Sequence, residues 1–413
     1  MVQQIRNGEL DPHTRPYLIG SRLIPLAKPQ GGVRPIAIGE VFLKLACMHA
    51  GLTTKDKLAD WLERNGQFGC STGGPEVVAN VMQARLADKR RPMLAINFDV
   101  KNAFNCMDRA HVIRQADKCD ALKPARRLVH WAYGGEPTPL WVKGPDDKVV
   151  ARLSSSQGVR QGDYFGSQLF CTGLDSVLEN VVQVFPSIMT DNVLAYADDS
   201  YLLFDAASPH VAAVCARFVD ELRAIGCDVN LNKTQGLYFH DTPLPPTTTD
   251  WLERNHVKLE TRAAKVVGAP IGRDVAAMQA LAEECARRHD EFFRLLCHNS
   301  MPAQEALLLL RVCGLPRFSF MLRVTSQEVH LPASKVFDQK MRHTLLNILG
   351  LDAEDFTSKM GARSRLPLSK GGFGLREQTF VSPFAVVSAS AQAASHLQRL
   401  LPGGQIDPAP LWG

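Results

Sequence analysis

Two apolar segments separated by acidic residues constrain this chain more than any other feature. Val193–Tyr196 and Tyr201–Phe204 have the composition of buried strands, and the residues between them are Ala-Asp-Asp-Ser. Asp is unfavourable in strands and is rarely buried without a partner. A tight turn explains one Asp, or an Asp followed by Gly, but neither Asp198 nor Asp199 is followed by Gly. The pattern predicts a hairpin that presents both carboxylates.

A third carboxylate ends another apolar run. Met93–Phe98 has the pattern of a buried strand, and Asp99 follows it directly. Three carboxylates brought together repel one another, and a divalent cation removes the conflict. Mg²⁺ prefers carboxylate oxygens together with substrate phosphates, and two such ions stabilise the entering and leaving oxygens of a phosphoryl transfer. From the acids alone, a solvated turn and a strand-terminal cap remain an alternative.

Composition places the chain among ordinary globular proteins. Its 413 residues are 45% hydrophobic and 22% charged, which favours several packed units and excludes a disordered tail, a collagen or a simple coiled coil. No apolar run reaches the roughly 18 residues of a membrane span, and the first residues lack a secretory signal. The net charge of +5 permits a nucleic-acid partner without requiring one. The ten scattered cysteines, without a CxxC pair, predict reduced thiols in an intracellular protein and no structural zinc.

Strand and helix patterns are mixed without a strict alternation. The predicted class is therefore α+β in the middle of the chain and all-helical later. The pattern predicts two strands in Ser21–Ile38 around Gln30-Gly31-Gly32, a long helix over Asp163–Val184, an amphipathic helix over His210–Gly226, strands at Val229–Leu231 and Gly236–Phe239, an exposed excursion at Pro243–Asp250, and helices over Val275–Gly350.

Several residues near the acids have side chains that suit nucleotide binding. Phe104 follows Asp99 by five positions, where its ring could lie under a sugar, and Ser154–Gly162 is a polar, Gly-containing turn entering a helix. Lys28 and Arg34 flank the glycines of the first hairpin, where they could grip phosphates. Taken singly, these signals are weak: the alternative for Phe104 is a core aromatic, and isolated Lys and Arg residues are more often plain surface charges.

The order of these segments resembles that of a reverse transcriptase of the non-LTR retrotransposon type. In chain order they read IPLAKPQGGVRPIAI, FDVKNAF, SSQGVRQGD, YADD, GCDVNLNKT and VVGAPIG. These look like fingers motifs followed by palm motifs A to E. The later segments PAQEALLLLRVCGLPRFSFMLR and LPLSKGGFGL are similar to the thumb and post-thumb region, so that the resemblance covers almost the whole chain.

The resemblance implies an α+β right-hand polymerase with fingers, a palm built on a small antiparallel sheet, and a helical thumb. The expected domains are fingers at residues 1–90 with an insertion at about 110–150, palm at 91–273, thumb at 274–350 and a connection-like extension at 351–413. Two departures from the family pattern stand out. Tyr164 occupies a position where motif B usually has proline, and no endonuclease-like, CCHC or ribonuclease H segment is evident.

The resemblance also implies a role for each candidate site residue. Asp99, Asp198 and Asp199, with the Val100 carbonyl, would hold two Mg²⁺ ions, for which Mn²⁺ is a possible substitute. The other expected roles are a steric gate against ribose at Phe104, contacts to the incoming nucleotide and template base at Gln161 and Gly162, contacts to the triphosphate at Lys28 and Arg34, proton donation to pyrophosphate at Lys233, and a primer grip at Val267–Ile271.

The implied function is RNA-directed DNA polymerase, a nucleotidyltransferase that adds dNTPs to a primer 3′-hydroxyl. Its partners would be an RNA template, a DNA primer and dNTPs, without a membrane, in the nucleus or cytoplasm. One alternative is a catalytically inactive scaffold that binds RNA or protein and derives from a truncated element copy. Another is an RNA-directed RNA polymerase, which Phe104 disfavours because such enzymes need a small or polar residue there.

Overall fold

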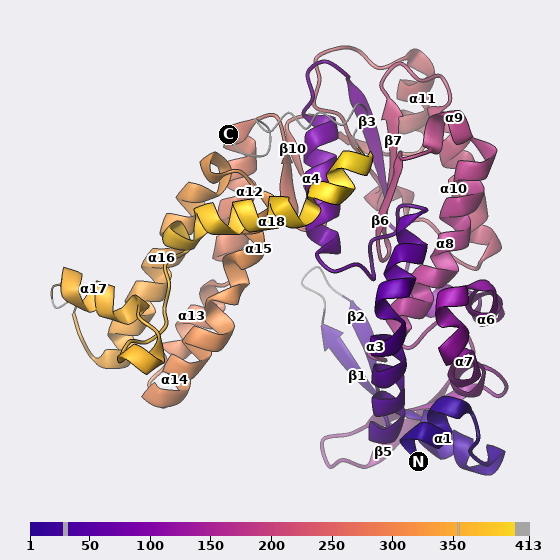
Figure 1. Cartoon of the computed structure of the whole chain (residues 1–413), viewed down its shortest axis with the longest axis horizontal. Coiled ribbons are helices and arrows are strands. Elements are labelled where there is room, and N and C mark those ends of the chain that lie inside the picture. The colour runs from indigo at the N-terminus through magenta and orange to yellow at the C-terminus, as the bar shows by residue number, and fades with distance from the viewer. Residues whose placement is uncertain (28–31, 353, 355, 401–413) are drawn as a thin grey trace. The chain divides into compact units, whose positions relative to one another are not determined.

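The computed structural model of the chain describes residues 1–27, 32–352, 354 and 356–400, which form two compact units (Figure 1). The first unit comprises Met1–Gly74, Met93–Gly236 and Pro243–Leu259. The second unit comprises Pro75–Pro92, Leu237–Thr242 and Glu260–Gly413. Both units contain strands and helices, which confirms the α+β class. The boundaries of fingers, palm and thumb stay a prediction.

A five-stranded sheet forms the centre of the first unit. The last residues of two of its strands, Leu237 and Glu260, belong to the second unit. The order of the sheet is β6-β7-β3-β8-β9, with bounds Val193–Tyr196, Asp199–Asp205, Met93–Phe98, Gln235–Leu237 and Lys258–Glu260. Strand β3 pairs antiparallel with β7, in a register that runs from Met93 opposite Asp205 to Phe98 opposite Ser200. The side chains of β3 are buried except that of Asn97, which is half-buried, so the strand is covered on both faces as its apolar composition predicts.

Helices supply the rest of the first unit's core. Helix α10 packs on the sheet, with the rings of Phe98 and Phe218 at a centroid distance of 4.8 Å. Asp108 caps helix α6, since its carboxylate accepts from the backbone N–H of Ala110. The helices are α1 (Val2–Asn7), α2 (Arg15–Ile19), α3 (Val41–Glu63), α5 (Ala103–Cys106), α6 (Arg109–Lys118), α7 (Arg126–Tyr133), α8 (Gly166–Val184), α9 (Pro186–Met189), α10 (Val211–Ala224) and α11 (Pro246–Arg254), with 3-10 turns at Pro12–Thr14, Asp120–Ala125 and Leu231–Lys233.

A second sheet of the first unit contains the predicted N-terminal hairpin. Its order is β2-β1-β4-β5, with bounds Val33–Gly39, Ser21–Ala27, Thr138–Lys143 and Val149–Ser155. Strands β1 and β2 pair antiparallel from Ser21 opposite Gly39 to Ala27 opposite Val33, which confirms the two predicted strands. Lys28, Gln30 and Gly31 lie outside the described residues.

The second unit combines one hairpin with a helical body. Strand β10 pairs antiparallel with β11, and among the described residues from Val275 onward every regular element is helical. The core of the helices includes the stacked rings of Phe318 and Phe337, 5.2 Å apart. The elements are α4 (Gly74–Leu86), β10 (Ala263–Val266), β11 (Ala269–Gly272), α12 (Val275–Arg287), α13 (Asp290–Leu296), α14 (Ala303–Leu309), a π-helical turn (Leu310–Gly314), α15 (Pro316–Val324), α16 (Gln327–Leu349), α17 (Ser358–Arg365), a 3-10 turn (Leu368–Lys370) and α18 (Gln378–Leu400).

Several predicted elements differ from the structure. The excursion predicted at Pro243–Asp250 is exposed at most positions, but it is irregular only as far as Pro245. Helix α11 begins at Pro246, where proline suits the first helical turn, and buries Leu252. The strand predicted at Val229–Leu231 is reduced to a single bridge between Val229 and Val100, followed by the 3-10 turn. The next strand begins at Gln235 and ends at Leu237, two residues short of Phe239.

No helix in the described part of the chain has the length and apolar character to cross a membrane.

Candidate active site

The acidic hairpin is tighter than the sequence predicts. Strand β7 already begins at Asp199, which pairs with Tyr196, so only Ala197 and Asp198 form the turn. Ala197 has φ 54°. A positive φ at the first of two turn residues belongs to a turn type that matches strand twist and usually has Gly at that position. Asp198 therefore lies at the tip of the hairpin and Asp199 at the first position of the strand.

Strand register brings the third carboxylate to the same edge. Phe98 is opposite Ser200, so Asp99, one residue beyond β3, lies beside the start of β7. The Asp99 carbonyl accepts from the backbone N–H of Asn230 at 2.7 Å, which holds the backbone after β3 in place. Asp99 is 99 positions from Asp198 in the chain. It meets Asp198 and Asp199 because β3 and β7 are neighbours in the sheet.

The electrostatic state of the acids reflects this proximity. Partial burial, then the negative charges of Asp198 and Asp99, raise the pKa of Asp199 to about 6. Partial burial and the charge of Asp99 also raise the pKa of Asp198, while the guanidinium of Arg34 acts in the opposite direction. Both residues remain accessible to solvent. The structure therefore brings Asp99, Asp198, Asp199 and Arg34 within electrostatic reach of one another.

The chemistry of these donors suits a hard divalent cation. Carboxylate oxygens that repel one another are ligands that Mg²⁺ takes, and the repulsion falls when a cation binds. In the geometry of the described residues, no group of three or more His, Cys, Asp or Glu side chains is arranged to hold a metal ion. Metal binding by Asp99, the Val100 carbonyl, Asp198 and Asp199 therefore stays a prediction.

Phe104 is held against helix α8 and against the loop that precedes it. Its ring stacks on Phe170 with a centroid distance of 4.4 Å and an interplanar angle of 20°. Its carbonyl accepts from the backbone N–H of Val159 at 2.7 Å. The ring is half-buried, so one part packs in the core and the other stays accessible. This geometry gives the ring a defined position a few residues from Asp99.

Gln161 and Gly162 join the same loop to the N-terminal hairpin. The backbone N–H of Ala37 in β2 donates to the Gln161 carbonyl at 2.8 Å. Gly162 has φ 112°, and a Cβ there would lie 2.7 Å from the Ala37 carbonyl oxygen, so a side chain does not fit. Arg34 lies on the same strand as Ala37. The loop and strand β2 therefore form one connected structure near the acids.

The remaining predicted residues are placed less directly. Lys233 is exposed in a 3-10 turn that follows Asp228, whose carbonyl accepts from the backbone N–H of Lys101. The chain before Lys233 thus runs beside the residues after Asp99. Lys28 lies outside the described residues. The segment Val267–Ile271 belongs to the second unit, at the β10–β11 hairpin.

Arg109 holds the loop and was missed by the sequence analysis. Its side chain is buried and donates to the carbonyls of Gly158, Ser155 and Gln157 at 3.0, 2.8 and 2.7 Å. Burial, then repulsion from the Arg160 guanidinium, lowers the pKa of Arg109 to about 10. Arg is usually exposed, and nothing local in the sequence marks this one as buried.

Arg160 is a second buried arginine that the sequence analysis did not single out. Its Nη1 donates to the Ile19 carbonyl at 2.8 Å, and its Nη2 lies 3.6 Å from Asp163 Oδ2. The guanidinium is 4.6 Å from the centre of the Tyr133 ring, whose hydroxyl donates to Asp163 Oδ2 at 2.7 Å. This network fixes both ends of the Gln161-Gly162 segment.

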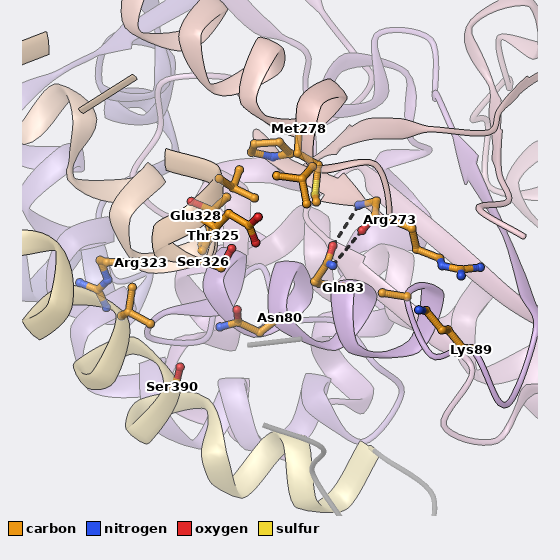
Figure 2. Close-up of a pocket in the computed structure, with 17 residues that line it drawn as sticks. Asn80, Gln83, Lys89, Arg273, Met278, Arg323, Thr325, Ser326, Glu328 and Ser390 are labelled. Carbon is orange, nitrogen blue, oxygen red and sulfur yellow. Dashed lines mark hydrogen bonds between the residues drawn. The ribbon is translucent and has the colours of Figure 1, made fainter. Parts of the chain in front are cut away.

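A pocket of about 220 Å³ lies wholly within the second unit, between α4, β11, α12, α15, α16 and α18 (Figure 2). At the wall of the pocket, Gln83 Nε2 donates to the Gly272 carbonyl at 2.9 Å, and the Gly272 N–H donates to Gln83 Oε1 at 3.0 Å. Pro270, from the segment predicted as a primer grip, is one of the lining residues. The predicted carboxylates belong to the first unit instead.

The chain matches a known protein family over most of the segment that contains the motifs. Residues 26–271 match the family described as reverse transcriptase (RNA-dependent DNA polymerase), which is more than half of the 413 residues. The match includes Asp99, Asp198 and Asp199. It confirms the resemblance seen in the motifs, and the mixed fold of sheets and helices agrees with the right-hand polymerase class.

Individual relatives give further comparisons. The chain is 27% identical over 93% of its length to the retrotransposable element SLACS 132 kDa protein of Trypanosoma brucei gambiense, and it spans 30% of that protein. Among solved structures it is similar to telomerase from Candida albicans in complex with a fragment of telomeric RNA (TM-score 0.49, 10% identity, 97% of this chain and 62% of that chain). It is also similar to apo telomerase from Candida tropicalis (TM-score 0.48, 11% identity, 97% and 70%).

Proposed function

The chain belongs to the reverse transcriptase (RNA-dependent DNA polymerase) family, and we propose from this premise that it is an active RNA-directed DNA polymerase of the non-LTR retrotransposon type. It adds dNTPs to the 3′-hydroxyl of a DNA primer along an RNA template. The observation that carries the proposal is the meeting of Asp99, Asp198 and Asp199 at one edge of the sheet, where partial burial, and then their charges, raise the pKa values of the last two.

The carboxylates are the proposed metal ligands. Asp99, the Val100 carbonyl, Asp198 and Asp199 would hold Mg²⁺, or Mn²⁺ in its place. When bound, such ions supply activation of the primer hydroxyl and neutralise charge on the departing pyrophosphate. The protein contributes a rigid edge on which the acids converge, because β3 pairs along its whole length with Ser200–Asp205 of β7. Catalysis of this kind rests on positioning and charge.

The residues around the acids would bind and select the nucleotide. The Phe104 ring, stacked on Phe170, cannot swing away freely, so it would clash with a ribose 2′-hydroxyl and favour deoxynucleotides. Gln161 and Gly162 would contact the nucleotide and the template base. Arg34, whose charge already reaches Asp198, would contact the triphosphate. Lys28 and Lys233 keep the proposed roles of phosphate contact and proton donor.

The proposed partners are an RNA template and a DNA primer. Contacts to a duplex backbone would depend on shape and phosphates and not on base sequence. Affinity should therefore fall as the salt concentration rises, because phosphate contacts release counterions. The chain spans 30% of its curated relative, and the activities of that whole protein are proposals for this chain.

The test is primer extension on an RNA template with dNTPs and Mg²⁺, with an Asp198→Asn, Asp199→Asn variant beside the wild type. Both substitutions keep side-chain size and remove mutual repulsion, so the variant should fold, which circular dichroism and a melting curve would check. Extension by the wild type alone supports the proposal. Extension by both places the site elsewhere or indicates a contaminant. Primer–template binding without extension by either would favour the inactive scaffold.

A further inference from the structure

Gln67 lies beside the acidic hairpin, although it is 130 positions from Ala197 in the chain. The residue is completely buried. Its neighbours extend the edge of the sheet, because the Ala195 N–H donates to the Gly66 carbonyl and the Phe68 N–H donates to the Ala195 carbonyl, both at 2.7 Å. This short parallel pairing carries the Gln67 side chain to the end of β6.

The side-chain amide of Gln67 holds the turn residue at two points. Its Oε1 accepts from the backbone N–H of Ala197 at 3.0 Å, and its Nε2 donates to the Ala197 carbonyl at 3.1 Å. The same Oε1 accepts from the Gly69 N–H at 2.8 Å. The amide therefore gives Ala197 the two bonds that a paired strand would give, at a position where β6 has ended.

Ala197 needs such support because its backbone is unfavourable. Its φ of 54° lies in the left-handed region, which residues with a Cβ rarely adopt. Backbone strain of this kind persists when the surrounding structure over-determines it. Gly69 leaves the space for the contact, since a Cβ there would lie 2.8 Å from the Ala197 nitrogen and 2.6 Å from Cys171 Sγ.

We propose that Gln67 is a positioning residue: its amide holds Ala197 in the left-handed conformation and thereby sets the direction of Asp198 and Asp199. The effect on catalysis rests on the proposed polymerase function, whereas the effect on the hairpin does not. An amide is required for both bonds. Met fills a similar volume without them, and Glu cannot donate to the Ala197 carbonyl and adds a fourth carboxylate near the acids.

The first test measures the hairpin directly. Alanine-selective ¹⁵N labelling of the full chain reports amide exchange at Ala197, which Gln67 holds, and at Ala195, which the Gly66 backbone holds. In Gln67→Met, exchange at Ala197 should accelerate about tenfold or more while exchange at Ala195 stays near the wild-type rate. Unchanged exchange at Ala197, or equal acceleration at both residues, overturns the proposal.

The second test measures primer extension. Gln67→Met should lower kcat on the order of 100-fold, because small displacements of reacting groups have effects of this size. Val214→Ala, which removes buried methyl groups from α10, is the control for lost stability and should keep wild-type kcat. Adding Ala197→Gly to Gln67→Met should recover part of the activity, since Gly adopts a positive φ without help.

The outcomes separate the two proposals. If the wild type extends primers and Gln67→Met loses no more activity than Val214→Ala, Gln67 has no positioning role. The same follows if the fold-changes in kcat of Ala197→Gly and Gln67→Met simply multiply in the double variant. If the wild type does not extend primers, the proposed function fails, and the exchange rates at Ala197 and Ala195 alone decide the assignment of Gln67.

Discussion

Replacement of Arg160 by Met tests how strongly the buried network supports the loop that contains Gln161 and Gly162. Only 4% of Arg160 is exposed, and its guanidinium faces Asp163 and the Tyr133 ring. Burial alone would lower the pKa of Arg160, but the influence of Tyr133 and Asp163 outweighs it and raises the pKa. The cation is therefore fully charged, and its removal leaves the Asp163 carboxylate buried without a counter-ion.

The expected loss of stability follows from what Asp163 retains. Removal of one partner from a buried ion pair destabilises a protein by about 3–5 kcal/mol. Asp163 keeps its bonds from the Tyr133 hydroxyl at 2.7 Å and from the Phe165 N–H at 3.1 Å, which favours the lower end, about 3 kcal/mol. Arg160→Met combined with Asp163→Asn leaves no unpaired charge, so its loss should be smaller than the sum of the single losses, with a coupling of about 1–3 kcal/mol.

The assay is urea unfolding of the wild type, both single variants and the double variant. Tryptophan fluorescence suits it, because Trp61, Trp131, Trp141 and Trp251 all belong to the first unit, which contains the network. A loss below about 1 kcal/mol in Arg160→Met would refute the reasoning. Additive losses in the double variant would equally mean that Arg160 and Asp163 do not act as a pair.

Three further results are expected. Phe104→Val should raise the use of ribonucleotides relative to deoxynucleotides about 10–100-fold in primer extension, since one steric contact is worth about 1–3 kcal/mol; unchanged discrimination would contradict the gate. Gly162→Ala should destabilise the first unit by about 1–3 kcal/mol, because its φ is 112° and the new Cβ meets the Ala37 carbonyl, and wild-type stability in urea would count against this geometry. Burial lowers the pKa of His330 to about 4, from about 6.5 in the unfolded chain. Its contribution to the free energy of unfolding, about 3 kcal/mol, is therefore complete above pH 6.5 and is lost as the pH falls towards 4. His330→Gln should flatten this part of the stability–pH curve, and an equally steep curve would assign the effect to other groups.

Local patterns predicted the strands that carry the candidate carboxylates. The apolar run before Asp99 and the interrupted apolar hairpin around Asp198 and Asp199 are recognisable without any knowledge of the fold, because strand burial leaves a direct pattern in the sequence. Helix α11 shows where this reasoning fails. Its Pro- and Thr-rich start has the composition of a loop, but the burial of Leu252 outweighs it.

The sequence by itself determined the identity and order of the acids, the strands that carry them and the family to which the chain belongs, since each of these depends on neighbouring residues. Only the tertiary structure decided which side chains hold the site in place. Gln67 contacts a residue 130 positions away, and Arg109 contacts a carbonyl 49 positions away. A buried polar side chain is stable only where its partners meet it, and that meeting is a property of the folded chain that no local pattern records.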